Sequence, residues 1–279
     1  MIRTERRRGM VAAVGGAAVL LALTACSSSD KGSDASSSSP SASSSASASA
    51  TTPKVTGSVT VFAAASLKES FTTLGKQFET AYPGTKVTFN FGGSDVLAAS
   101  ITSGAPADVF AAASTKTMKI VTDAKDAAGT PATFVRNQLE IATLPGNPDK
   151  IASLKDLTKS GLKVALCAKT VPCGAAAQTA LTDSGLKLTP VSYEQDVKAA
   201  LTKVELKEVD AAVVYKTDVK AAGGKVQGVD FPESAKAINT YPIVELKNAP
   251  NGTAAQAFIA LVRSAEGQKV LTGAGFLNP

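Results

Sequence analysis

The chain has 279 residues, of which 44% are hydrophobic and 5% aromatic, and it contains neither histidine nor tryptophan. The lack of histidine excludes Ser-His-Asp and Cys-His catalysis and histidine metal sites, and the scarcity of aromatic rings argues against stacking platforms for sugars or single-stranded nucleic acid. The formal net charge of +6 falls to +3 without residues 1–25, which hold four Arg and one Glu, and so mild a charge argues against a nucleic-acid partner.

Residues 1–25 have the pattern of a bacterial lipoprotein signal peptide. A basic segment, RTERRRG, precedes the apolar run MVAAVGGAAVLLALTA, and the run leads through the lipobox LTAC into Cys26. The pattern predicts cleavage before Cys26 and lipidation of that residue. An uncleaved transmembrane anchor is the alternative, but the run is shorter than a full span. With Cys26, the Ser/Ala-rich residues up to 53 predict a disordered tether between a lipid anchor and an extracytoplasmic domain.

From residue 54 on, stretches typical of strands alternate with stretches typical of helices. In the first series, strands are predicted at 58–64, 86–91, 108–112 and 137–144. Helices are predicted at 66–81, 94–103 and 114–123. Ser66 and Glu69 fit the S-x-x-E capping box, which predicts that Ser66 is the N-cap of the first of these helices.

A second series follows and predicts a second lobe. Its strands are predicted at 162–166, 210–215, 226–231 and 238–246. Its helices are predicted at 153–159, 174–184, 194–205, 216–222, 253–263 and 266–272. Such alternation is typical of α/β units whose sheets are covered on both faces. The chain is predicted to cross between the lobes twice, near 136–141 and 239–243.

Two cysteines remain beside Cys26, in the segment LCAKTVPCG. Outside the cytoplasm a disulfide between Cys167 and Cys173 is favoured over two free thiols, and Pro172 and Gly174 could form the tight turn that it needs. A zinc site is disfavoured, because the chain has no second cysteine pair and no histidine.

Several predicted helix starts could converge on one anion site. Ser66 and Ser94 each follow a predicted strand, and the segments VPCG and QDVK place the amides of Cys173 and Val197 in first turns. First-turn N–H groups lack helical partners and carry partial positive charge, so together they could bind an anion without Lys or Arg. Tyr215 could add a phenolic donor. Each feature alone fits an ordinary cap or core residue, and only the combination favours a site.

These residues lie in motifs that resemble a known family. The segments VFAAASL, FGGS, GAPADVF, VPCG, QDVKAAL and VVY occur in the order found in the molybdate-binding proteins that serve molybdate ABC transporters. The resemblance covers 57–279 and implies an α/β, two-lobed type II periplasmic-binding-protein fold, in which each lobe is a central mixed sheet flanked by helices and two crossover strands form the hinge. Lobe 1 would comprise 54–138 plus 242–279, and lobe 2 would comprise 139–241.

The resemblance also implies a set of ligand contacts. Two serine hydroxyls, two backbone amides and one tyrosine would hold the anion: Ser66, Ser94, Cys173, Val197 and Tyr215. Cys173 stands where the family has VPAG, but a backbone N–H survives that change. Molybdenum would be held as its oxyanion, with no direct protein–metal ligand and no catalytic cofactor. Asp108 in GAPADVF is expected to be structural and to hold loops near the site.

Molybdate and tungstate are tetrahedral dianions without protons, so a site made of hydroxyls and amides suits both. Sulfate has the same donor requirements. Phosphate keeps a proton near neutral pH and needs an acceptor, which Asp95 could supply.

The expected partners are the oxyanion, an ABC permease with its ATPase, and the membrane through the lipid anchor, and the chain is expected to be a monomer. The alternatives are a protein of the same fold for sulfate, phosphate or another oxyanion, an enzyme with Ser66 as nucleophile, and a structural surface lipoprotein.

Overall fold

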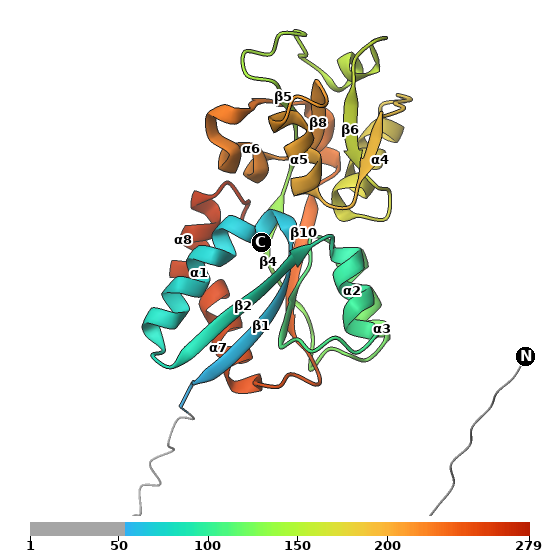
Figure 1. The fold of residues 1–279 in the computed structure, drawn as a ribbon. Helices are drawn as coiled ribbons and strands as arrows, with labels where there is room; N and C mark the ends of the chain where they lie inside the picture. The colour runs from blue at the N-terminus through green and yellow to red at the C-terminus, as the bar shows by residue number, and fades with distance from the viewer. Residues whose placement is uncertain (1–53) are drawn as a thin grey trace, which may run out of the picture. The chain divides into compact units, whose positions relative to one another are not determined.

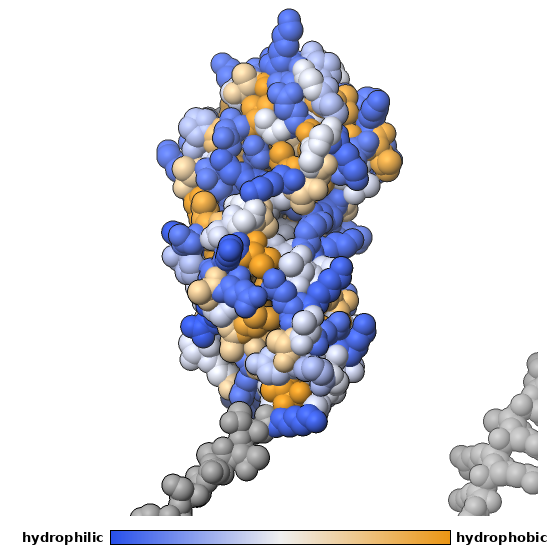
Figure 2. Space-filling model, turned by 90° about the vertical axis from the view of Figure 1, so that its left-hand side faces the viewer, coloured by the Kyte–Doolittle hydropathy of each residue, from blue (hydrophilic) through white to orange (hydrophobic). Residues whose placement is uncertain are grey.

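The structure is a computed structural model that describes residues 54–279 (Figure 1). The predicted signal peptide, the predicted lipidation site Cys26 and the predicted tether lie outside the described residues. Within 54–279, no helix combines the length and apolar character needed to cross a membrane. Figure 2 shows one face, on which apolar residues are scattered among hydrophilic ones in small patches.

The first lobe is built on a five-stranded sheet in the order β2-β1-β3-β10-β4. The central strand β1 runs parallel to β2 and β3, whereas β10 runs antiparallel to β3 and β4. The strands are β1 (Gly57–Ala64), β2 (Thr85–Gly92), β3 (Val109–Ala111), β4 (Ala132–Asn137) and β10 (Asn239–Glu245). The helices are α1 (Lys68–Ala81), α2 (Ser94–Thr102), α3 (Thr115–Asp123), α7 (Gly252–Arg263) and α8 (Ala265–Gly273).

The second lobe is built on a five-stranded sheet in the order β7-β6-β8-β5-β9. The strands are β5 (Leu139–Thr143), β6 (Val164–Cys167), β7 (Ser192–Glu194), β8 (Ala211–Tyr215) and β9 (Gln227–Val229). The helices are α4 (Pro172–Asp183), α5 (Val197–Glu205) and α6 (Lys216–Ala222). Four 3-10 turns complete the described chain: η1 (Ala65–Leu67), η2 (Leu154–Thr158), η3 (Gly223–Lys225) and η4 (Pro232–Lys236). The α/β class with two mixed sheets flanked by helices is therefore confirmed.

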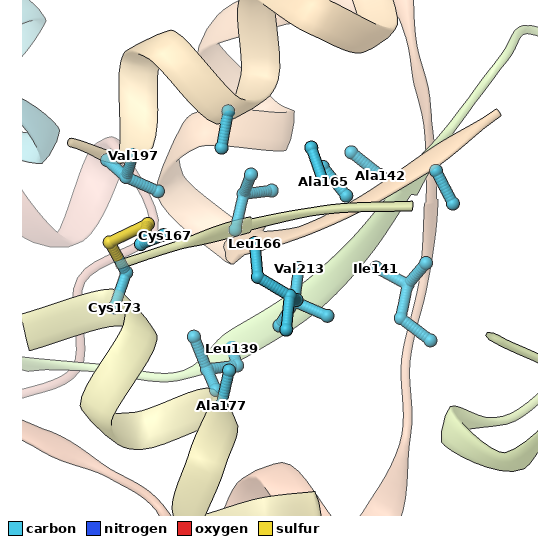
Figure 3. Packing of buried hydrophobic residues seen from close by; sticks show 14 of the residues in the cluster. Leu139, Ile141, Ala142, Ala165, Leu166, Cys167, Cys173, Ala177, Val197 and Val213 are labelled. Carbon is cyan, nitrogen blue, oxygen red and sulfur yellow. A yellow bond between two sulfur atoms is a disulfide. The ribbon is translucent and has the colours of Figure 1, made fainter. Parts of the chain in front are cut away.

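Each lobe has its own buried core. Side chains alternate along β1, so that Val61 and Ala63 pack with α1, α7 and α8, whereas Phe62 packs with α2 and α3 on the other face. The second core consists mainly of small aliphatic residues, some of which Figure 3 shows around β6 and α4. The two main cores are almost separate, because Ala65 in η1 is the one described residue of the first lobe that packs in the core of the second.

The chain crosses between the sheets twice, and the two crossings lie side by side. β4 ends at Asn137 in the first sheet and β5 begins at Leu139 in the second. The return strand β10 begins at Asn239, which is paired with Asn137. A register shift follows between Tyr241 and Pro242, where proline has no N–H to donate to the ladder.

Several predicted elements differ from the structure. The helix predicted at 153–159 is the 3-10 turn η2. The strand predicted at 137–144 is only the second of two strands, because the crossing at Gln138 separates β4 from β5. The helix predicted at 194–205 begins at Val197, because residues 192–194 form the short edge strand β7 and Asp196 caps the helix.

Candidate functional site

A small cavity lies between the two lobes. It encloses about 10 Å³, which is on the order of the space that one water-sized group needs. All five residues of the predicted ligand set line it: Ser66, Ser94, Cys173, Val197 and Tyr215. The remaining lining residues are Ala64, Ala65, Gly92, Gly93, Ala113, Val171, Pro172 and Asp196. The five predicted ligand residues thus come together from five separate segments of the chain, while their role as ligands stays a prediction.

Ser66 is buried in the 3-10 turn between β1 and α1, and its predicted role as a helix cap is wrong. Helix α1 begins at Lys68 with Leu67 in the N-cap position and without a side-chain cap. The 3-10 turn places Ser66 one residue ahead of that cap, so the capping box with Glu69 does not form. Instead, the hydroxyl oxygens of Ser66 and Tyr241 lie 2.8 Å apart and share a hydrogen bond.

Ser94 is the first residue of α2, after Gly93 in the N-cap position. Its Oγ accepts a hydrogen bond from the Ala113 N–H at 3.0 Å, and its side chain is buried. A serine hydroxyl has one proton and can accept through its lone pairs. Because the backbone N–H of Ala113 can only donate, the proton of Ser94 remains available to a ligand in the cavity.

Two helices of the second lobe begin at the cavity. In α4, Pro172 occupies the first turn and Cys173 follows it. In α5, Asp196 is the N-cap, and its Oδ1 accepts from the Ala199 N–H at 2.9 Å. The other first-turn amides, including those of Cys173 and Val197, have no acceptor within their own helix. They present partial positive charge to the cavity without any cationic side chain.

The start of α4 is fixed covalently and sterically. A disulfide joins Cys167, at the end of β6, to Cys173, with their Cα atoms 5.8 Å apart, and Figure 3 shows it beside Val197. The next residue, Gly174, packs so closely on the backbone oxygens of Cys167 and Ala168 that a Cβ would clash with both. The amide of Cys173 is therefore held in one place by its neighbours on either side.

Tyr215 ends β8, is buried, and lines the cavity. Within the described part of the chain, its Oη has no hydrogen-bond partner. Burial, together with the nearby Tyr241 and Asp218, raises the pKa of Tyr215 well above its ordinary value, so the phenol stays protonated. A buried hydroxyl without a partner is costly, and an acceptor bound in the cavity would satisfy it.

An ion pair joins the two lobes beside the cavity. Lys198 follows Val197, and its Nζ lies 2.9 Å from Oε2 of Glu69 in α1 and 3.2 Å from Oδ1 of the buried Asp218 in α6. Burial opposes the lysine charge, but the two carboxylates raise the pKa of Lys198 above its ordinary value. Burial raises the pKa of Asp218 to about 6, against the opposing effect of Lys198. Lys198 is therefore paired with the carboxylates of Glu69 and Asp218, and it does not line the cavity.

Two acidic residues from the motifs have other places than expected. Asp95 does not line the cavity. Asp108 is buried, and it accepts from the Thr60 N–H at 2.7 Å and from the Asn251 N–H at 2.6 Å. It therefore has a structural role, because it connects β1 to the start of α7. It does not line the cavity.

Sequence reasoning missed three residues of the crossings. Tyr241 contacts Ser66, and Asn137 contacts Tyr241 in turn. Asn239 donates through Nδ2 to the Ala113 carbonyl at 2.7 Å and to the Pro172 carbonyl at 3.4 Å, so it joins both lobes at the cavity. The available signal was their position on the predicted crossing segments, where a polar side chain meets both lobes.

Comparisons with known proteins agree with one another on the family of this chain. The sequence profile described as bacterial extracellular solute-binding protein matches residues 59–277. The molybdate-binding protein ModA of Mycobacterium tuberculosis is 43% identical over 222 residues, which cover 80% of this chain and 85% of that protein. The periplasmic molybdate-binding protein of Azotobacter vinelandii aligns with a TM-score of 0.69 and 22% identity, over 79% of this chain and 99% of that one.

A further solved structure shares the fold. The sulfate-binding protein SubI of Mycobacterium tuberculosis aligns with a TM-score of 0.67 and 19% identity, over 79% of this chain and 86% of that one. At this identity, and at that of the Azotobacter protein, likeness shows a common fold and not a common ligand.

Gly93 permits the close approach of the two lobes, so a larger residue at this position should interfere with binding. A Cβ at this position would lie 2.5 Å from the Gln195 carbonyl oxygen in the second lobe. Gly93→Ala should hold the lobes apart and weaken the binding of a tetrahedral oxyanion, such as sulfate or molybdate, by roughly tenfold. Calorimetric titration measures this, with Gly129→Ala as control because a Cβ at Gly129 meets nothing within 4 Å. Equal affinities of the two variants would contradict the prediction.

The buried carboxyl of Asp218 predicts a pH dependence of folding stability. Its pKa is raised from 3.8 to about 6 in the folded protein, so the stability that its proton confers is complete below pH 3.8 and is lost as the pH rises through 6. The free energy of unfolding of the wild type, relative to Asp218→Asn, should rise by roughly 1 kcal/mol from pH 7 to pH 5. Urea unfolding at both pH values measures it.

In the difference between the wild type and Asp218→Asn, the contributions of other titrating groups to the free energy of unfolding cancel. Burial and the nearby Asp230 also raise the pKa of Glu140 to about 6, but Glu140 is present in both proteins and cancels in the difference. An unchanged difference between the two proteins at pH 7 and pH 5 would refute the assignment to Asp218.

Proposed function

Because this chain belongs to the family of bacterial extracellular solute-binding proteins, we propose that it captures molybdate in the cavity between its lobes. The relative from Mycobacterium tuberculosis that is 43% identical over 222 residues is a molybdate-binding protein, which supports this ligand. The same cavity is expected to take tungstate, whose oxyanion has the same charge and nearly the same size.

The chemistry of the cavity carries the proposal. Its polar groups are hydroxyls and first-turn amides, and none of the described lining residues is Lys or Arg. The only carboxylate among them is that of Asp196, whose Oδ1 caps α5. Such a set of donors suits an anion that accepts hydrogen bonds and has no proton to donate.

The competing oxyanions differ in how well the cavity suits them. Phosphate keeps a proton near neutral pH and needs an acceptor, and Asp95, the acceptor considered from the sequence, is not among the lining residues. Sulfate is a proton-free dianion, and the fold shared with a sulfate-binding protein keeps it as the second candidate. The hydrogen-bond donors of the cavity suit sulfate and molybdate equally. The two anions must therefore be distinguished by their size and by their measured affinities.

The proposed mechanism is capture and delivery. The lobes, proposed as 54–138 plus 242–279 and 139–241, close about the two crossings when the anion binds donors from both. The closed form is then recognised by an ABC permease, driven by its ATPase. The proposal includes a lipid anchor on Cys26, a position on the outer face of the cytoplasmic membrane, and a monomer as the working form.

Calorimetric titration of the full chain in detergent tests the ligand. Molybdate and tungstate are expected to bind with one site per chain, sulfate more weakly, and phosphate without measurable heat. Clear binding of sulfate or phosphate together with no heat from molybdate would refute the molybdate assignment.

Ser66→Asp tests the site. A carboxylate in place of the hydroxyl would face a dianion at close range and should abolish binding. Ser103→Asp adds the same charge at an exposed position after α2 and should leave the affinity unchanged. Normal molybdate binding by Ser66→Asp would show that Ser66 is not a ligand.

A further inference from the structure

We propose that Tyr241 is a positioning residue, whose phenolic proton goes to Ser66 Oγ and thereby directs the single Ser66 proton into the cavity. This inference rests on the proposed function, because it concerns how the same cavity recognises a proton-free oxyanion. It assigns a role to a residue that does not itself line the cavity.

The direction of one hydrogen bond decides what Ser66 can do. Its Oγ lies 2.8 Å from Tyr241 Oη, and both residues are buried. If Ser66 donated to Tyr241, its only proton would be used, and Ser66 could then only accept from a ligand. Molybdate has no proton to donate. Ser66 therefore contributes to the proposed site only if Tyr241 is the donor.

The side chain of Asn137 sets that direction. Its Oδ1 accepts from the Gln138 N–H at 3.0 Å, which identifies the opposite side of the amide as Nδ2. Nδ2 can only donate, and it lies 2.8 Å from Thr217 Oγ1 and 3.4 Å from Tyr241 Oη. Tyr241 therefore receives a donor from Asn137. If it also accepted from Ser66, its own buried proton would have neither Ser66 nor Asn137 as an acceptor, which is unfavourable.

Packing holds the Tyr241 hydroxyl in place. The ring lies edge-to-face with Phe276 at 5.5 Å and with Phe134 at 6.5 Å, measured between centroids. Burial raises the pKa of Tyr241 above its ordinary value, so the phenol keeps its proton. The remaining candidate acceptor for that proton is the Tyr215 hydroxyl, on a ring 6.2 Å away, and the experiment below separates it from Ser66.

Ser94 shows the same arrangement with a simpler donor. There the Ala113 N–H, which can only donate, occupies the lone-pair side of the hydroxyl. Both serines thus have a donor behind the oxygen and a proton left for the cavity. For Ser66 that donor comes from β10 and is oriented from β4, so the crossings that join the lobes also set the direction of the proton.

A double-mutant cycle on the full chain in detergent tests the inference. Tyr241→Phe keeps the ring and removes the hydroxyl, and should weaken molybdate binding about tenfold, as expected for one hydrogen bond to a charged group. In the Ser66→Ala background the same change should alter Kd by less than about twofold, because Tyr241 acts through Ser66. Tyr82→Phe, at the end of α1, is the matched control and should have no effect.

A second readout separates positioning from a general loss of structure. Without Tyr241 Oη, Ser66 can turn and accept from a protonated anion, so the affinity ratio of molybdate to hydrogen phosphate should fall in Tyr241→Phe. The phosphate affinity is measured by competition with molybdate, because direct titration with phosphate is expected to give no measurable heat. A loss of packing would weaken both anions alike and leave the ratio unchanged.

Three results would overturn the inference. Tyr241→Phe binds molybdate as the wild type does, or it loses affinity equally with and without Ser66, or Tyr215→Phe rather than Ser66→Ala removes its effect. Failure of the proposed function is visible separately, in the wild-type titration. If the wild type binds sulfate instead of molybdate, the same cycle run with sulfate still decides the role of Tyr241.

Discussion

The structure depends on hydrogen-bond donors that have no partner within their own element. The first turns of α4 and α5 leave the amides of Cys173 and Val197 without helical acceptors, and Tyr215 Oη has no partner in the described part of the chain. These groups meet in a cavity between two lobes. Buried donors without acceptors are costly, so an acceptor in the cavity, whether water or a ligand, would stabilise this arrangement. A small anion is the simplest group that satisfies donors from both lobes at once.

The lobes are linked by the two crossings of the chain and by direct contacts of side chains. Each has its own main core, and the chain passes between them only at the two adjacent crossings. The direct bridges at the cavity are modest: Asn239 contacts a carbonyl in each lobe, and Lys198 pairs with the partly exposed Glu69. A partly exposed ion pair contributes on the order of 1 kcal/mol or less. In the proposed mechanism, such contacts favour the closed arrangement of the lobes only weakly, and the bound anion stabilises it further.

The sequence predicted the α/β class, the two series of elements and the segments that meet at the cavity, because strand and helix patterns are local and helix starts can be recognised. It predicted a helix-cap role for Ser66 that is wrong. The S-x-x-E pattern is present, but a 3-10 turn shifts the helix start to Lys68. Nor could a pattern reveal the contact between Ser66 and Tyr241, which are 175 residues apart and meet only through the order of strands in the first sheet.

The two kinds of donor in the cavity differ in what the sequence must specify. A backbone amide depends on where its helix begins and not on its own side chain, so Cys173 can supply this donor, provided that Gly174 allows the turn to pack on Cys167 and Ala168. A hydroxyl can turn, and its use as a donor depends on the group behind it. For Ser94 that group is a backbone N–H, and for Ser66 it is a side chain from another strand. The residues that decide how Ser66 meets an anion therefore lie outside its own motif.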